Sequence, residues 1–141
     1  MTLADTSAIV AAFAVWHDQH EAVDKAVGDG GPLIAHCALE TFSTLTRMPA
    51  PGRASPGTVL EFLGSRFSDD LITLSPSGHR SLLESLLAFE ISGGATYDAL
   101  VAATAAEAGA TLVTCDRRAM PVYESFAIDV ELLPARALNT S

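Results

Sequence analysis

Short apolar runs alternate along the chain with longer stretches whose apolar residues recur at helical spacing. The expected helices span Ser7–Ala14, Asp18–Val27, Leu39–Arg47, Pro56–Phe67, His79–Ile91 and Thr96–Ala108. Four short runs predict strands and a further run predicts a fifth; they are Thr2–Ala4, Pro32–Ala35, Leu71–Leu74, Thr111–Thr114 and Ile128–Leu132. Strands separated by helices are typical of an α/β fold with a mostly parallel sheet, here of four or five strands.

Residues that start and stop helices support these boundaries. The expected N-caps are Ser7, Ser55 and Thr96, and Pro56 follows Ser55 at the first helical position, where proline is favoured. A Pro-Ala-Pro-Gly cluster and several glycines separate the elements. The pattern contains no internal repeat and no linker, so we expect one domain over residues 1–141, with a loose tail after about residue 134.

The charge of the chain limits its partners. Seventeen acidic residues stand against eight basic ones, for a net charge of −9. A strongly acidic protein repels phosphates at long range and is therefore a poor non-specific binder of nucleic acid. If this protein acts on nucleic acid, it must do so at a local site, with the help of metal cations.

Cysteine usage and hydropathy indicate the compartment. The chain has two cysteines, Cys37 and Cys115, too few for a zinc cage or a disulfide framework. We therefore expect reduced thiols, as in the cytoplasm. The N-terminus lacks the basic and apolar regions of a signal peptide, and no apolar run approaches the ~20 residues of a membrane span. These features predict a cytoplasmic protein with no membrane partner.

Four acidic residues share one kind of position. Asp5 and Asp116 follow expected strands, whereas Glu40 and Asp98 lie near the starts of expected helices. Each has a structural explanation when taken singly, because acids cap helices, complement the helix dipole and occupy turns. In an open parallel sheet, however, such positions converge on the edge where ligands bind. We therefore expect the four carboxylates to face one another.

Converging carboxylates need positive charge. The only lysine is Lys25, and the nearest basic residues in sequence are Arg117 and Arg118, which follow Asp116 directly. Hard divalent cations such as Mg²⁺ and Mn²⁺ prefer carboxylate oxygens and would neutralise the cluster. Carboxylate-held metals are suited to phosphodiester hydrolysis. Arg117 and Arg118 are then candidates for holding a phosphate of RNA.

Three segments carry a resemblance to a known family. They read LADTSAIVA near the N-terminus, ALETFSTLTR in the middle, and TYDALVAATAAEAGATLVTCDRRA near the C-terminus. In this order and spacing they resemble the PIN domain, most closely the VapC-type toxin nucleases of bacterial toxin–antitoxin (VapBC) pairs, over the whole chain. The resemblance implies a three-layer α/β/α sandwich. It also implies a metal-dependent endoribonuclease that cuts specific RNAs, such as a tRNA or ribosomal RNA loop, and so inhibits translation and growth.

The resemblance also assigns roles to individual residues. Asp5, Glu40, Asp98 and Asp116 match the four acids of the family site, which bind Mg²⁺ or Mn²⁺ and are catalytic. Thr6, Ser7 and Thr114 match its supporting hydroxyl residues. Hydrolysis by an activated water would leave a 5′-phosphate. The implied partners are the RNA substrate, a cognate VapB-type antitoxin that inserts a basic side chain among the carboxylates, and a second copy in a homodimer.

Other protein classes are weighed against the same residues. A haloacid-dehalogenase-type phosphatase needs a second acid two residues after the first, where this chain has Ser7. A response-regulator receiver needs adjacent acids near its start and a lysine after a late strand, and the chain has neither. The alternative that stays open is a catalytically inert PIN-like scaffold that binds RNA or protein, although its four acids are intact.

Overall fold

The computed structural model describes residues 1–133, and the tail expected after about residue 134 lies outside them. In these residues the strands are β1 (Thr2–Ala4), β2 (Leu33–Ile34), β3 (Leu71–Ile72), β4 (Thr111–Thr114) and β5 (Val130–Leu132). The helices are α1 (Thr6–Phe13), α2 (His20–Val27), α3 (Ala35–Arg47), α4 (Pro56–Arg66), α5 (Pro76–Ala88), α6 (Ala95–Ala108), the 3₁₀ helix η1 (Arg117–Ala119) and α7 (Met120–Glu124). None of the helices between residues 1 and 133 is both long enough and apolar enough to span a bilayer.

All strand pairings are parallel. β4 pairs with β1 on one side and with β5 on the other, and β2 pairs separately with β3. β2 also lies close to β1, so the two ladders adjoin. The α/β fold class with a parallel sheet is confirmed, with the difference that the five strands form ladders of three and two.

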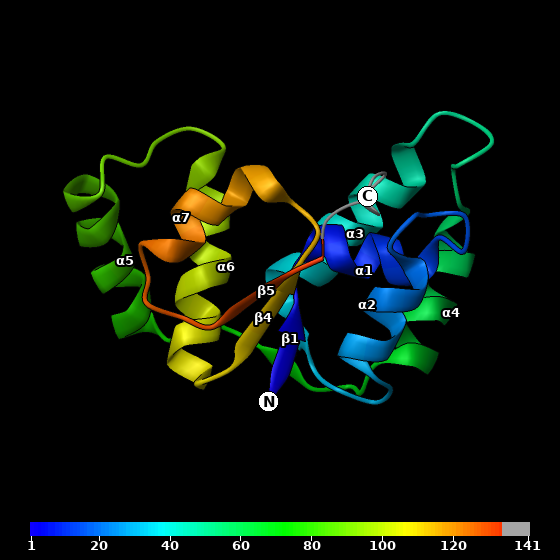
Figure 1. Ribbon diagram of the computed structural model, residues 1–141, viewed down its shortest axis with the longest axis horizontal. Coiled ribbons are helices and arrows are strands. Elements are labelled where there is room, and N and C mark those ends of the chain that lie inside the picture. The colour runs from blue at the N-terminus through cyan, green and yellow to red at the C-terminus, as the bar shows by residue number, and fades with distance from the viewer. Residues whose placement is uncertain (134–141) are drawn as a thin grey trace, which may run out of the picture.

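Helices cover the strands on both sides, which gives the three-layer arrangement (Figure 1). Helices α1 to α4 lie on one side and α5, α6 and α7 on the other. β1 and β4 lie between these layers, and their residues Leu3, Leu112 and Val113 are almost completely buried. Strands that are covered on both faces are expected to be apolar throughout, which explains their unbroken hydrophobic runs.

Some boundaries differ from those expected. Ser55 caps α4 as predicted, and Gly109 ends α6 with a left-handed backbone (φ 65°). The N-cap of α1, however, is Asp5 and not Ser7. α6 begins at Ala95 without a side-chain cap, so Thr96 is not its cap. Helix α3 starts directly at the end of β2, at Ala35, four residues before the expected start at Leu39.

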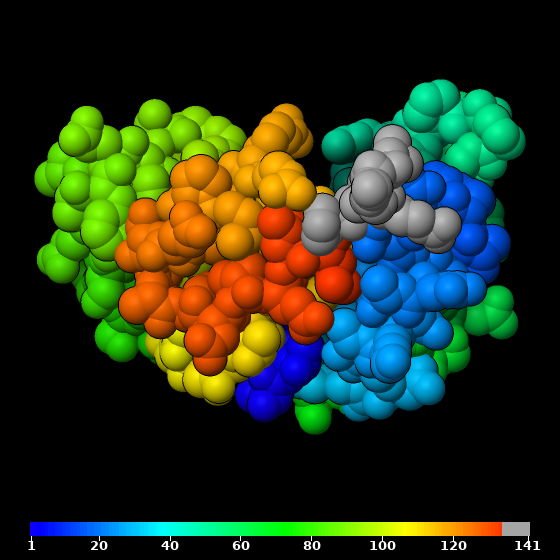
Figure 2. Space-filling view, in the orientation of Figure 1, coloured from blue at the N-terminus to red at the C-terminus, as the bar shows by residue number. Residues whose placement is uncertain are grey.

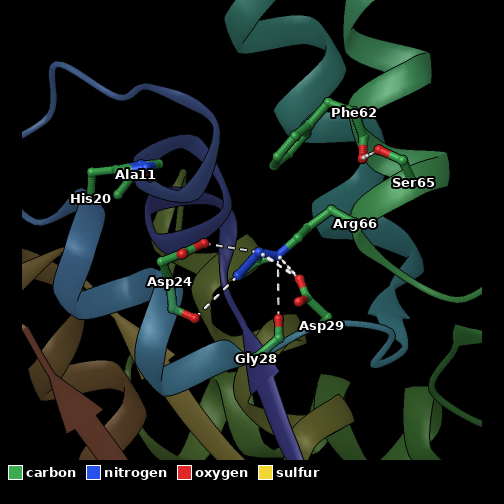
Figure 3. Close-up of polar contacts among 8 residues, drawn as sticks. All are labelled: Ala11, His20, Asp24, Gly28, Asp29, Phe62, Ser65 and Arg66. Atoms are coloured by element: carbon green, nitrogen blue, oxygen red, sulfur yellow. Dashed lines mark hydrogen bonds and ion pairs between the residues drawn. The ribbon is translucent and has the colours of Figure 1, made fainter.

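A partly buried arginine joins two neighbouring helices (Figure 3). Arg66 of α4 reaches the C-terminal end of α2, where its guanidinium donates to Asp24 Oδ1 (2.9 Å) and Asp29 Oδ1 (3.2 Å). It also donates to the backbone carbonyls of Gly28 (3.2 Å) and Asp24 (3.3 Å). The Gly28 N–H already donates to the Asp24 carbonyl, so Arg66 adds a second donor there and supplies one to the carbonyl of Gly28, the C-cap residue of α2.

Candidate active site

A cleft of about 530 Å³ lies at the carboxyl ends of β1 and β4. Figure 2 shows a notch in the surface on this side, between the segment around η1 and that of α3. All four predicted acids line the cleft, together with Thr6, Ser7 and Arg118: the acids are Asp5, Glu40, Asp98 and Asp116. The positions that sequence reasoning placed on one edge of the sheet therefore meet around one opening.

Asp5 is the most deeply placed of the acids, with 4% of its surface exposed. It follows β1 directly and caps α1, since Oδ1 accepts a hydrogen bond from the backbone N–H of Ala8 (3.0 Å). The same oxygen accepts from the Ser7 hydroxyl (2.6 Å). The short strand leads straight into a helix, so the geometry of the helix start aims this carboxylate at the cleft.

Burial raises the pKa of Asp5, because a charge loses solvation in the interior. Hydrogen bonds to its carboxylate from Ser7, Thr114, Tyr123 and the Ala8 amide oppose that shift, since they favour the ionised form. The site thus combines a dry environment with donors that stabilise a carboxylate. This is a costly arrangement for a residue whose only role is to cap a helix.

The residue that sequence reasoning missed is Tyr123. Its hydroxyl donates to Asp5 Oδ2 at 2.7 Å, across 118 positions of the chain. Burial and the charge of Asp5 raise the pKa of the phenol far above its usual range, so it keeps its proton and stays a donor. Tyr123 lies in α7, a five-residue helix with a proline at its second position. Neither the length nor the composition of that helix gives a periodic signal.

Glu40 extends from α3 and is exposed, which places it at the rim of the cleft. The Thr6 hydroxyl donates to its Oε1 at 2.6 Å, which links the starts of α1 and α3. His36 lies one helical turn earlier, with Nε2 3.6 Å from the same oxygen, and its ring stacks on that of Tyr97 at 5.4 Å between centroids. The role of Thr6 is thus to orient Glu40.

Asp98 lies in the first turn of α6 and is half-buried. Its pKa is raised to about 6, and burial is the largest cause. The charges of Asp116, Asp5 and Glu40 add to the shift, in that order, while Arg118 lowers the pKa. Like charges within a few ångströms disfavour ionisation. The raised pKa of Asp98 thus reflects burial first, with the negative charge of the other three carboxylates adding to it.

Hydroxyl groups hold the turn after β4. The backbone N–H of Asp116 donates to Thr114 Oγ1 (2.9 Å), and that of Cys115 donates to Ser7 Oγ (2.8 Å). Ser7 Oγ and Thr114 Oγ1 lie 3.3 Å apart, so the two supporting hydroxyls join the start of α1 to the end of β4. Thr114 is fully buried and lies beneath the site, where it orients Asp116 through the backbone.

The two arginines differ in position. Arg118 lines the cleft, its side chain is 94% exposed, and its Nε lies 3.6 Å from Asp116 Oδ1. Arg117 is exposed but is not among the residues that line the cleft. Of the two predicted phosphate contacts, the structure therefore brings only Arg118 to the carboxylates.

The donor set suits a hard cation. In residues 1–133 no three His, Cys, Asp or Glu side chains are gathered closely enough to hold a metal by themselves. Mg²⁺, however, keeps several of its waters and is usually bound by one or two carboxylates together with substrate phosphates. An excess of carboxylates around the cleft, whose charges add to the raised pKa of Asp98, fits such an ion.

Comparison with known proteins agrees with this geometry. The profile of the PIN domain family matches residues 2–124, a range that includes all four acids and Tyr123. Ribonuclease VapC40 of Mycobacterium tuberculosis, found in strains H37Rv and CDC 1551, is 46% identical over 133 residues, which cover 94% of this chain and 99% of that protein.

A second relative comes from the same organism. Ribonuclease VapC27 of Mycobacterium tuberculosis is 39% identical over 127 residues, which cover 89% of this chain and 92% of that protein. The chain belongs to the PIN domain family and, within it, to the VapC proteins.

Proposed function

We propose that this protein is a metal-dependent endoribonuclease toxin that cuts specific RNAs and is neutralised by a cognate antitoxin. The single observation that carries the proposal is the meeting of Asp5, Glu40, Asp98 and Asp116 around one cleft. The printed names of both relatives, which call them ribonucleases, support the reaction class.

The four acids are assigned to the catalytic centre as ligands of Mg²⁺ or Mn²⁺. When bound, such an ion neutralises phosphate charge and makes water a better nucleophile at neutral pH. Hydrogen bonds from Ser7 and the Ala8 amide orient the Asp5 carboxylate and favour its ionised form. Thr6 holds Glu40, and Thr114 holds the backbone of Asp116.

The exposed Arg118 contributes the positive charge for the phosphate at the cleft. Water attacks the phosphorus and the 3′ oxygen leaves with a proton. The products are therefore a 5′-phosphate and a 3′-hydroxyl.

Cleavage of RNA by the purified protein tests this proposal. Activity should require Mg²⁺ or Mn²⁺, disappear with EDTA and return when the metal is restored. Asp98→Asn should abolish it, because the substitution removes a charged ligand with little change in shape. Asp69→Asn is the matched control, since Asp69 is exposed and precedes β3, at the opposite end of the strands from the cleft. Activity that persists in EDTA would contradict the proposal.

The RNA target requires an experiment in cells. Expression of the native chain should arrest growth and create new 5′-phosphate ends at a few positions in cytoplasmic RNA, in tRNA or ribosomal RNA if the resemblance extends to the substrate. The Asp98→Asn variant should do neither. If the native chain and the variant leave identical RNA ends and growth, the inert binding scaffold becomes the better explanation.

The antitoxin and a second copy of this chain are the proposed protein partners. Among the apolar residues of α4, Leu60 is 60% exposed, and Leu39 on the neighbouring α3 is 75% exposed. A basic antitoxin segment would be attracted by the net charge of −9, since complementary charge speeds association. The antitoxin is tested by copurification: it should bind the protein and suppress RNA cleavage. The second copy is tested by measuring the mass of the free protein in solution.

A further inference from the structure

Asp5 is held by two different parts of the chain. Its Oδ1 accepts hydrogen bonds from Ser7 and from the Ala8 amide, both within three positions in sequence. Its Oδ2 accepts from Tyr123, which belongs to α7 on the other side of the sheet. The first pair of contacts comes with the start of α1, whereas the third depends on the packing of the whole domain.

Tyr123 is placed to hold that oxygen firmly. Its side chain is 1% exposed and packs in the main core, which includes Val101 and Ala105 of α6. Tyr123 also lines the cleft, so a ring held by the core presents its hydroxyl at the site. Within the described part of the chain, the Asp5 carboxylate is the one hydrogen-bond partner of this hydroxyl. The phenol therefore points a single donor at a single acceptor.

The hydrogen bonds that Asp5 accepts are divided unequally between its two carboxylate oxygens. An ionised carboxylate has about four lone-pair sites, two on each oxygen. Oδ1 accepts two direct hydrogen bonds, from Ser7 and the Ala8 amide, whereas Tyr123 makes the one direct hydrogen bond to Oδ2 within the described residues. Oδ2 is therefore the oxygen with more acceptor capacity left, and Tyr123 is the residue that sets its position.

We propose that Tyr123 is a positioning residue of the metal centre, whose hydroxyl fixes the Asp5 carboxylate so that Oδ2 presents one lone pair to the divalent cation. The inference rests on the proposed function, because it assumes that Asp5 is a metal ligand. Groups that hydrogen-bond to metal ligands orient them, and their loss typically weakens metal affinity or activity by about 10- to 100-fold.

Direct measurement of metal binding tests the proposal without RNA. Mn²⁺ is added to the native protein and to Tyr123→Phe, and free Mn²⁺ is followed by electron paramagnetic resonance. The substitution removes one oxygen and keeps the ring that fills the core. We expect the dissociation constant for Mn²⁺ to rise at least about tenfold.

A matched control separates positioning from loss of stability. Thr104 is buried in α6, and its hydroxyl donates to the Leu100 carbonyl at 2.7 Å, with no contact to an acid of the site. Thr104→Val therefore also removes one buried, hydrogen-bonded hydroxyl. We expect it to lower Tm while leaving Mn²⁺ affinity within twofold of the native value.

Kinetics on RNA give a second reading. At subsaturating Mn²⁺, Tyr123→Phe should lower kcat and leave KM for RNA unchanged, because the residue acts on a ligand and not on the substrate. For Tyr123→Phe, the Mn²⁺ concentration that gives half-maximal activity should rise by the same factor as the dissociation constant for Mn²⁺. Thr104→Val should show neither change.

The native protein offers a test that does not depend on whether Tyr123→Phe folds. The chain contains only two tyrosines, so labelling tyrosine with ¹³C at Cζ produces two signals. Tyr97 is 55% exposed, and Tyr97→Phe identifies its signal. On titration with diamagnetic Mg²⁺, the Tyr123 signal should move more than that of Tyr97, because the ion withdraws charge from the oxygen that the Tyr123 hydroxyl bonds.

Two negative results have different meanings. If native protein binds Mn²⁺ and Tyr123→Phe binds it within twofold as tightly, the positioning role is wrong while the metal centre stands. The same holds if the Tyr123 signal does not respond to Mg²⁺. If the native protein binds no Mn²⁺, the metal centre of the proposed function fails and the tyrosine's role fails with it.

Discussion

Two groups of acidic residues in this protein differ in the positive charge that the fold places beside them. At the junction of α2 and α4, Asp24 and Asp29 share the guanidinium of Arg66, whose side chain is 11% exposed. At the cleft, four carboxylates meet, and the only cation near them in the described residues is Arg118, with a side chain that is 94% exposed. The first group has one partly buried cation for two acids, whereas the second has one exposed cation for four acids and so a larger excess of negative charge.

The difference separates acidic residues that support the packing of helices from acidic residues that are candidates for function. Arg66 also caps backbone carbonyls at the end of α2, so its ion pairs serve the packing of two helices. At the cleft, burial together with the charges of the neighbouring acids raises the pKa of Asp98 to about 6. Groups with strongly shifted pKa values in a cleft are candidates for function, because folding alone gains nothing from them. A bound cation from solution would supply the missing charge.

The largest expected effect is stabilisation by a divalent cation. At a Mn²⁺ concentration about 100 times the dissociation constant, a single site raises the free energy of unfolding by about 2.7 kcal/mol. Thermal unfolding with and without Mn²⁺ measures this gain. The gain should be much smaller in Asp98→Asn at the same concentration. Equal gains in both proteins would show that the cation binds elsewhere.

Loss of the partly buried arginine should come next. Arg66→Met keeps the apolar stem but removes the donor to Asp24, Asp29 and the Gly28 carbonyl, and because water can reach both carboxylates we expect a loss of about 1 kcal/mol. Chemical denaturation measures it. Arg80→Met, at an exposed arginine of α5, is the control and should change stability little. Mn²⁺ should stabilise Arg66→Met as much as the native protein, because the two acidic groups are independent.

A smaller, pH-dependent effect is expected at Asp98. Its pKa rises from 3.8 to about 6 on folding, so between these values the folded protein holds a proton that the unfolded chain has released. The contribution of this group to stability is present below pH about 4 and is lost as the pH rises through about 6.

In metal-free buffer at about pH 7.5, Asp98→Asn should therefore unfold at a higher temperature than the native protein. The difference should shrink toward pH 4, where both side chains are uncharged. Melting curves across this range measure it. A difference that stays constant with pH would assign the gain to packing and not to charge.

The smallest effect is expected at the exposed arginine. Arg118→Ala should change the free energy of unfolding by less than about 0.5 kcal/mol, since an exposed ion pair contributes little. Its effect should appear instead in a higher KM for RNA. A stability loss as large as that of Arg66→Met would mean that Arg118 also supports the packing of the fold.

Local patterns in the sequence predicted much of the fold and the acids of the site. The apolar run Thr111–Thr114 and the Ser55-Pro56 pair were sufficient to place β4 and the start of α4. Such signals lie within a few residues of the feature they specify. That Asp5, Glu40, Asp98 and Asp116 are catalytic and hold metal stays a prediction, although their convergence on one cleft agrees with it.

Features that depend on distant contacts were not predictable. The bond from Tyr123 to Asp5 joins residues 118 positions apart, and no spacing rule connects them. Helix α3 begins directly after Ile34 with no side-chain cap, so the residue types there give no start signal. The division of the five strands into ladders of three and two is likewise a matter of which distant strands pair, which no local pattern specifies.

Because Asp5 is also the N-cap of α1, damage at this position has two consequences at once. Replacing a capping acid by alanine typically costs about 0.5–2 kcal/mol of stability, so Asp5→Ala lowers the amount of protein in the cell as well as its chemistry. If cells that express the protein are selected for survival, two kinds of inactivating mutation should then be recovered. Variants at residue 5 would be scarce on an immunoblot, whereas those at residue 98 would accumulate as intact, harmless protein.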